Sequence, residues 1–263
     1  MRALLFAILL NTACPLWAQD SLYRSDIHRF ADATIHTYTR PLHWKQKQWL
    51  TFGGIIAGTA AITLLDEPVR NFFVHTQDGF PDFIESVGYH YGKPYSAVIF
   101  SGGFYLAGMI LNDRWSKETG LNLGVTLLTS GLLQTVLKDV VGRARPGTGL
   151  GPYEFKIPSE GEIAYHSFPS GHSAVAFGIT LVMARRIASQ PIKILFYALA
   201  ASTALSRMHA DAHWFSDIAF GAALAWVCDD TVRRRLLVNR TRNRAISWKL
   251  TPSLRGIGVV GRF

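Results

Sequence analysis

The chain has 263 residues, of which 49% are hydrophobic and only 17% are charged, a charged share below the roughly 25% of an ordinary soluble domain. Its formal net charge of +9 raises the question of nucleic-acid binding. The positive charge, however, is concentrated in one tail, because residues 229–263 hold nine Lys and Arg residues against two Asp residues. A basic tail behind an apolar helix is typical of a membrane-side anchor. The charge distribution therefore argues against a nucleic-acid partner.

The first 18 residues have the outline of a bacterial secretory signal. Arg2 precedes an apolar run from Ala3 to Leu10, and the segment Leu16-Trp17-Ala18 ends in a small residue, as expected near a cleavage site. We predict a signal-like leader at 1–18, with a short uncleaved anchor as the alternative. The polar segment that follows, 19–48, has the aromatic spacing of an amphipathic interfacial helix.

Six apolar stretches of helix length follow this segment and predict an all-α fold. Several are shorter than the ~20 residues that a bilayer-spanning helix needs, so their polar flanks must lie within the span. Their many glycines permit close helix packing in a membrane. We expect a six-helix membrane-embedded bundle over 49–230, followed by a basic C-terminal tail at 231–263; buried helices of a soluble bundle are the alternative. The stretches are Trp49–Leu65, Tyr95–Leu111, Leu121–Leu137, Ser173–Ile187, Ile192–Leu205 and Phe215–Val227.

Charges between the stretches predict an orientation. Residues 66–94 carry five acidic residues against two basic ones, whereas Arg185, Arg186 and Lys193 flank the connection between the fourth and fifth stretches. By the positive-inside rule, that connection and the tail are cytoplasmic. A cleaved leader followed by six spans would give the opposite orientation. Either the leader is not cleaved, one stretch does not span, or the protein is not membrane-spanning.

A first polar cluster follows the third stretch and consists of Lys138 and Arg145-Pro146. The two basic residues are seven apart, which is two helical turns, so both face one point if the helix continues that far. Pro146 then ends the helix. Basic residues commonly flank membrane helices, so this cluster alone is weak evidence for a site.

A second cluster, Phe168-Pro169-Ser170-Gly171-His172-Ser173, immediately precedes the fourth stretch. Gly171 allows the backbone to approach a ligand closely, and the N-terminus of the following helix suits a phosphate group. Ser170 has a purely structural explanation as a helix N-cap. His172 is not needed for capping, which favours a functional role.

A third cluster consists of Ser206-Arg207, His213 and Asp217. His213 and Asp217 are four residues apart, so on a helix they share a face and the carboxylate is able to orient the imidazole ring. An ionisable Asp217 among apolar neighbours would be costly unless it had a partner. A structural His–Asp pair is the alternative.

Together, the three clusters supply the groups that phosphoryl transfer requires without a metal or another cofactor. Fixed cations offset the charge that spreads over the phosphate oxygens in the transition state. One histidine is able to attack phosphorus while the other protonates the leaving oxygen. The cations are Lys138, Arg145 and Arg207.

These clusters resemble the three-part signature of the type 2 phosphatidic acid phosphatase superfamily, and the resemblance covers about residues 49–230. The constellation is also similar to that of soluble bacterial class A acid phosphatases and vanadium haloperoxidases. The resemblance implies a six-helix core of the phosphatidic acid phosphatase/haloperoxidase type. It further implies a phosphohistidine intermediate on His213, oriented by Asp217, with His172 as general acid. The phosphate would be held by Lys138, Arg145, Ser170, the Gly171 amide and Arg207, whereas Arg143, His166 and His209 remain unassigned.

The expected activity is that of a phosphatase at the periplasmic face of the bacterial inner membrane. From the resemblance, its substrate would be a phosphorylated lipid such as phosphatidic acid, phosphatidylglycerol phosphate, undecaprenyl diphosphate or a lipid A phosphate. A soluble periplasmic acid phosphatase of broad specificity is the alternative that the leader favours. The complete signature argues against a non-catalytic membrane protein. No feature of the sequence indicates an oligomeric state.

Overall fold

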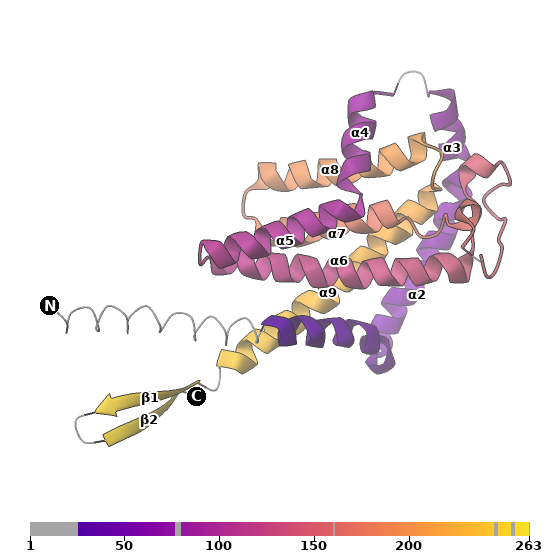
Figure 1. The fold of residues 1–263 in the computed structure, drawn as a ribbon. Helices are drawn as coiled ribbons and strands as arrows, with labels where there is room; N and C mark the ends of the chain where they lie inside the picture. The colour runs from indigo at the N-terminus through magenta and orange to yellow at the C-terminus, as the bar shows by residue number, and fades with distance from the viewer. Residues whose placement is uncertain (1–25, 77–79, 160, 245–246, 254–255, 263) are drawn as a thin grey trace.

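The protein is largely helical (Figure 1) in a computed structural model that describes residues 26–76, 80–159, 161–244, 247–253 and 256–262. An N-terminal helix covers residues 26–39. Short 3₁₀ helices join or interrupt the later elements: η1 (Arg40–His43), η2 (Thr63–Leu65), η4 (Pro146–Thr148) and η5 (Ile163–Tyr165). The α-helices are α2 (Gln46–Ile62), α3 (Asp66–His75), α4 (Asp82–Tyr91), α5 (Pro94–Ile110), α6 (Arg114–Val141), α7 (Gly171–Arg186), α8 (Gln190–His209) and α9 (Phe215–Arg244).

The all-helical prediction holds for each of the six apolar stretches, but the helices differ from the prediction in number and length. The segment 66–94, which we expected to be a loop, forms α3 and α4. Helix α9 continues to Arg244, so the predicted boundary between bundle and tail at residue 230 falls inside a helix. The predicted leader at 1–18 lies outside the described residues.

The C-terminal tail contains a two-stranded antiparallel sheet beyond α9. Strand β1 (Ser247–Ser253) pairs with β2 (Gly256–Arg262), with Ser247 opposite Arg262 and Ser253 opposite Gly256. In Figure 1 this hairpin lies at the end of α9 that is remote from α3 and α4. The tail is therefore not wholly helical.

Capping residues define the ends of the two helices that matter most for the site. The Asp113 carboxylate accepts hydrogen bonds from the first backbone N–H groups of α6, a typical N-cap. Gly142 ends the same helix with a left-handed backbone (φ 56°), which glycine adopts without a Cβ clash. Ser170 caps α7 by accepting from the Ser173 amide. Consequently α6 stops, and α7 starts, at fixed points beside the intervening loop.

Helix α7 is at the centre of the bundle and packs against α6, α8 and α9. In Figure 1, α7 lies between α8 and α6. Its buried apolar side chains interlock with those of α6, as in a close-packed core. The main core cluster consists of Tyr91, Leu123, Leu127, Ala176, Ile179, Val182, Met183 and Ala200.

Two glycines allow neighbouring helices to approach backbone to backbone. A Cβ on Gly88 would lie 2.1 Å from the Ser202 carbonyl oxygen, where α4 crosses α8. A Cβ on Gly120 would lie 2.3 Å from the Tyr105 backbone nitrogen, where α6 crosses α5. Small residues at crossings are typical of helix packing in membranes.

Helix α2 contrasts with the rest of the bundle, because none of its residues is buried. It packs against α9, yet a Cβ added at Gly53, Gly54 or Gly58 would meet nothing within 4 Å. Among the described residues, two segments, Gln46–His75 and Arg114–Val141, are long and apolar enough to cross a membrane by length and composition. An apolar helix with no buried residue leaves a large hydrophobic surface for another partner.

The two ends of the bundle differ in which helix ends and connections lie there. Helix α7 begins, α8 ends and α9 begins at one end, which also receives the end of α6. The α7–α8 connection and the C-terminal half of α9 lie at the other end. All three polar clusters of the sequence therefore lie at a single end.

Candidate active site

The second and third clusters are joined directly by their backbones. The Ser170 amide, just before α7, donates a 3.1 Å hydrogen bond to the Asp217 carbonyl oxygen in the first turn of α9. Close packing supports this contact, since a Cβ on Gly221 would lie 2.6 Å from the Ser170 carbonyl oxygen. Residues more than 40 positions apart in sequence thus form one structural unit.

The first cluster reaches the same place through a shared acceptor. The His166 carbonyl oxygen accepts from Lys138 Nζ at 2.6 Å and from Arg145 Nη2 at 3.4 Å. Our expectation that one helix presents both cations is wrong, because α6 ends at Val141. Arg145 instead lies in the following loop and is held by the Ile163 carbonyl oxygen at 3.0 Å. The two cations converge even so.

His213 lies in the loop between α8 and α9 and is only 5% exposed. Its Nδ1 is 2.8 Å from the Ser167 carbonyl oxygen, which accepts only if Nδ1 carries the proton. The other ring nitrogen, Nε2, is then unprotonated and has a lone pair. Asp217 Oδ2 is 3.9 Å from Nδ1, so the expected direct orientation of the ring by this carboxylate is not what the structure shows.

The surroundings of His213 favour its neutral form. Burial lowers the pKa of His213 well below its ordinary value, and the neighbouring charges of Lys138 and Arg145 lower it further. Desolvation disfavours the imidazolium ion, and positive neighbours repel it. A neutral imidazole with a free lone pair is the form that acts as a nucleophile.

Asp217 is fully buried and accepts hydrogen bonds from three donors. Arg143 Nη1 lies 2.6 Å from Oδ1, whereas Ser167 Oγ at 2.5 Å and the Trp214 amide at 2.9 Å bond to Oδ2. Ser167 thus binds His213 through its carbonyl oxygen and Asp217 through its hydroxyl group. The carboxylate therefore positions the ring indirectly, by holding the Ser167 segment in place.

Arg143 continues this network to α3. Its guanidinium group is 3% exposed and also donates to Asp66 Oδ2 at 2.7 Å. Asp66 in turn accepts from the Ser216 amide at 2.8 Å. One buried cation is therefore shared by two buried carboxylates, which satisfies charges that would be costly if left unpaired.

His172, Tyr89 and Arg207 form a stack beside the converged cations. The rings of Tyr89 and His172 are 5.5 Å apart at 27°, and the Arg207 guanidinium carbon is 4.6 Å from the Tyr89 ring centre. The positive charges of Arg207, Lys138 and Arg145 all lie close enough to repel a proton on the His172 ring. Within the described residues, the buried His172 Nε2 and Arg207 Nε have no hydrogen-bond partner.

Ser170 and Gly171 complete the set of predicted residues. Ser170 Oγ accepts from Ser173 N at 3.4 Å and from Ser173 Oγ at 3.0 Å, which leaves its own hydroxyl proton available. Gly171 is the first residue of α7, where backbone N–H groups lack intrahelical acceptors. Both residues lie where an anion would be stabilised by the start of the helix.

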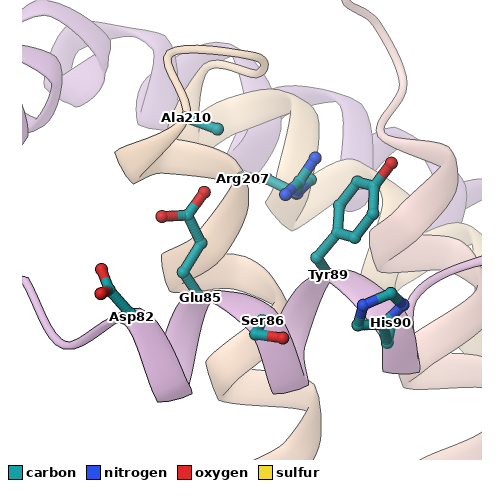
Figure 2. A pocket seen from close by; sticks show the side chains of 7 residues that line it. All are labelled: Asp82, Glu85, Ser86, Tyr89, His90, Arg207 and Ala210. Carbon is teal, nitrogen blue, oxygen red and sulfur yellow. The ribbon is translucent and has the colours of Figure 1, made fainter.

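An open pocket of about 390 Å³ adjoins this arrangement and is drawn in Figure 2. In Figure 2 the Arg207 side chain lies beside the Tyr89 ring, with α4 supplying most of the other wall. Arg207 is the residue shared between the pocket and the predicted site. The lining residues are Asp82, Glu85, Ser86, Tyr89, His90, Arg207 and Ala210.

Several residues of this site could not be identified from the sequence. Arg143 lies within the first cluster but has no evident role until Asp66 and Asp217 are seen around it. Tyr89 has no motif, and Ser167 binds His213 through its backbone, which any residue provides. The unassigned His166 and His209 have other partners: Asp139 Oδ1 at 3.0 Å and Glu85 Oε2 at 2.9 Å, respectively.

The helical bundle brings the three clusters together at one end, and comparisons with known proteins agree with the resemblance that the clusters carry. Residues 119–236 match the sequence profile of the PAP2 superfamily. This region includes each of the eight predicted site residues. This match agrees with the resemblance that the three clusters predicted.

Among the proteins that resemble parts of the chain are two curated relatives and one solved structure. Lipid A 1-phosphatase of Rhizobium johnstonii is 36% identical over 110 residues, which is 41% of this chain and 44% of the relative. Lipid A 1-phosphatase of Rhizobium etli is 35% identical over 106 residues, which is 40% of this chain and 44% of the relative. The match thus spans less than half the length of these relatives.

The solved structure is that of a transmembrane PAP2 type phosphatidylglycerolphosphate phosphatase from Bacillus subtilis. It is 20% identical to this chain, with a TM-score of 0.50, and the alignment covers 70% of this chain and 92% of the other. At this identity, the likeness concerns the fold alone. It agrees with the helical bundle described above.

Proposed function

We propose that the protein is a phosphatase that removes phosphate from a phosphorylated lipid through a phosphohistidine intermediate on His213. The observation that carries this proposal is the convergence of Lys138 and Arg145 on one carbonyl oxygen beside the neutral, buried His213. Fixed cations around a nucleophile stabilise the charge of a transferring phosphoryl group. The names of the two curated relatives also support a lipid phosphate as substrate.

In the first step, His213 Nε2 attacks phosphorus and the bond from phosphorus to the leaving oxygen breaks. His172 gives a proton to that oxygen, which therefore leaves as a hydroxyl group on the dephosphorylated lipid. The negative charge of the bound phosphate favours protonation of His172 before this step. Lys138, Arg145 and Arg207 hold the other oxygens, together with the Ser170 hydroxyl and the Gly171 amide.

In the second step, His172 takes a proton from water while the water oxygen attacks phosphorus. The N–P bond breaks, inorganic phosphate leaves and Nε2 regains its lone pair. Throughout both steps, the Nδ1–H group of His213 donates to the Ser167 carbonyl oxygen, which lies 2.8 Å from Nδ1. This bond keeps the ring in one tautomer as charge develops on it.

The direction of the leaving group follows from the position of His172. Its ring is stacked on Tyr89, and Tyr89 lines the open pocket in Figure 2. A proton donor must lie next to the leaving oxygen. We therefore place the dephosphorylated head group in this pocket and the phosphate on the side of Lys138 and Arg145.

A membrane location is supported by α2 and by the charges of the two ends. An apolar helix without a buried residue is stable in lipid but exposes hydrophobic surface in water. The basic α7–α8 connection, with Arg185 and Arg186, lies at the end opposite the site. By the positive-inside rule that end is cytoplasmic, so we propose that the site faces the periplasm of the inner membrane.

Phosphate release from detergent-purified protein would test the proposed function. The substrates would be phosphatidic acid, phosphatidylglycerol phosphate, undecaprenyl diphosphate, a lipid A phosphate and the soluble ester p-nitrophenyl phosphate. We expect release from at least one lipid at a kcat/KM well above that for the soluble ester. Equal activity on the soluble ester, with release of the protein from carbonate-washed membranes, would support a soluble acid phosphatase instead.

A further inference from the structure

A second pocket, of about 540 Å³, lies between the N-terminal helix, the start of α2 and the second half of α9. In Figure 1 these segments lie together, away from α3 and α4. A small core in which Ala33 packs with Val232 and Leu236 joins the N-terminal helix to α9, and α2 packs against α9 separately. The pocket is therefore a defined part of the fold, with walls from three separate segments.

Its polar wall is strongly positive. The charged and titratable residues that line it are His36, Arg40, Lys47, Asp230, Arg234 and Arg235. Arg234 pairs with Asp230, and Arg235 pairs with Asp32. Within the part of the chain that the structure describes, Arg40 and Lys47 form no ion pair, so two cations of this wall are left for an anionic ligand.

The titration of His36 reflects the same excess of positive charge. Burial lowers the pKa of His36, and the charges of Arg235 and Arg40 lower it further, against an opposing effect of Asp32. The ring is therefore neutral at pH 7 and able to accept or donate a hydrogen bond. An anion in the pocket would reduce the mutual repulsion of these cations.

The remaining wall is aromatic and aliphatic. Trp44, Phe52, Ile55 and Trp226 line it, and the rings of Trp44 and Phe52 are 5.4 Å apart. Tryptophan is enriched where a protein meets the interface between lipid head groups and acyl chains. A ligand that matches both walls has an anionic head and an apolar tail.

The pocket lies at the opposite end of the bundle from the candidate active site. Asp217 and Arg235 lie on the same continuous helix, α9, and are about 27 Å apart along its axis at 1.5 Å per residue. That separation is close to the ~30 Å hydrocarbon thickness of a bilayer. If the active site is at one membrane surface, the pocket is at the other.

We propose that this pocket binds an anionic phospholipid of the leaflet opposite the active site. Arg40 and Lys47 bind the head-group phosphate, and the acyl chains lie against Trp44, Phe52 and Trp226. Basic residues at a membrane surface attract anionic lipids, and the effect is weakened by salt. We treat the lipid as a structural ligand, because His36 is the one histidine among the described lining residues and a second histidine to protonate a leaving group is not among them.

Tryptophan quenching by brominated lipids would test this proposal on the full chain in non-ionic detergent. Trp44 and Trp226 line the pocket, so a lipid brominated on its acyl chains should quench them when it binds. We expect phosphatidylglycerol to half-saturate the quenching at a concentration at least tenfold lower than phosphatidylcholine. Equal half-saturation by the two lipids would overturn the proposal.

Matched variants separate this pocket from general attraction to a basic protein. The double substitution Arg40→Gln/Lys47→Gln should remove the tenfold preference, whereas Lys193→Gln at the start of α8 should leave it unchanged. Circular dichroism would show whether the double variant folds. If it does not, the charge-preserving Arg40→Lys/Lys47→Arg variant should retain the preference for phosphatidylglycerol. In the unmodified protein, about 500 mM salt should abolish that preference. Persistence of the preference at high salt would overturn the proposal equally.

Discussion

Arg143 and Asp217 form a buried ion pair, with Nη1 2.6 Å from Oδ1, at the centre of the network that supports His213. The same guanidinium group also pairs with Asp66 at 2.7 Å. One cation is thus shared by two carboxylates, neither of which is exposed. The network links the start of α3, the loop after α6 and the start of α9. We therefore expect its loss to affect both the stability of the protein and the position of His213, the proposed nucleophile.

Substitution of Arg143 by Met should destabilise the protein by about 3–5 kcal/mol, because it leaves two buried carboxylates without a counterion. Thermal unfolding in detergent would measure this effect. Arg70 offers a matched control, since it forms a bidentate pair with Asp211 and lies at a similar distance over the Trp214 ring. Because the Arg70–Asp211 pair is partly exposed, Arg70→Met should cost about 1 kcal/mol. Equal losses in the two variants would contradict a special role for Arg143.

His213→Ala should abolish turnover, with a loss of about 10⁴-fold or more, the order seen when an enzyme nucleophile is removed. Incubation with a ³²P-labelled lipid and an alkaline quench should trap label on the unmodified protein but not on the variant. His172→Ala should retain some trapping, because attack by His213 remains possible for a substrate with a good leaving group. Label that persists in His213→Ala would exclude His213 as the phosphorylated residue.

The acid limb of kcat/KM should lie well below pH 6.5. In the free protein, burial and then the charges of Lys138 and Arg145 lower the pKa of His213, so the ring stays neutral and nucleophilic as the pH falls past its ordinary value. Since kcat/KM reports the free enzyme, a pH profile would show this directly. Lys138→Met should move the acid limb to higher pH. A limb at or above pH 6.5 in the unmodified protein would contradict this assignment.

Tyr89 should position Arg207 and His172 through its ring and not through its hydroxyl group. The ring contacts both residues, and a cation–π contact of this kind is worth about 0.5–2 kcal/mol. Tyr89→Leu should therefore lower kcat/KM about tenfold, whereas Tyr89→Phe should change it little. Steady-state kinetics of the two variants would distinguish these outcomes; a large loss in Tyr89→Phe would instead assign a role to the hydroxyl group.

Vanadate should inhibit the enzyme competitively, because it can occupy the phosphate position opposite His213. EDTA should leave the activity unchanged, since Lys138, Arg145 and Arg207 supply the positive charge that a metal would otherwise provide. Inhibition assays with dialysed protein would check both expectations. Loss of activity in EDTA that is restored by a divalent cation would count against the proposed chemistry.

The helical class of the fold and the superfamily were predictable from sequence because both depend on local patterns. The six apolar stretches are long, and the three clusters have characteristic residues at short spacings. Helices α3 and α4 were missed because each has only ten residues and charged side chains interrupt its apolar ones, so neither forms a continuous apolar stretch. The roles of the eight site residues and the domain boundaries remain predictions.

The support of the site was beyond sequence analysis for a different reason. Four-residue spacing predicted that Asp217 would contact the His213 ring, but the start of α9 lies just after His213, so the two residues do not share a helical face. The His213 ring instead donates its hydrogen bond to the Ser167 carbonyl oxygen. Arg143 and Asp66 are 77 positions apart, and no local pattern connects them.

The open space beside three glycines of α2 has a consequence for which substitutions the protein tolerates. An added methyl group at Gly53, Gly54 or Gly58 meets no atom, whereas the same addition at Gly88 or Gly120 would overlap neighbouring backbone. Homologous chains should therefore accept other apolar residues at these three positions of α2, whereas the two glycines at the helix crossings should stay unchanged. A deep mutational scan of this protein should show that substitutions are tolerated at the three glycines of α2 and not tolerated at the two crossing glycines.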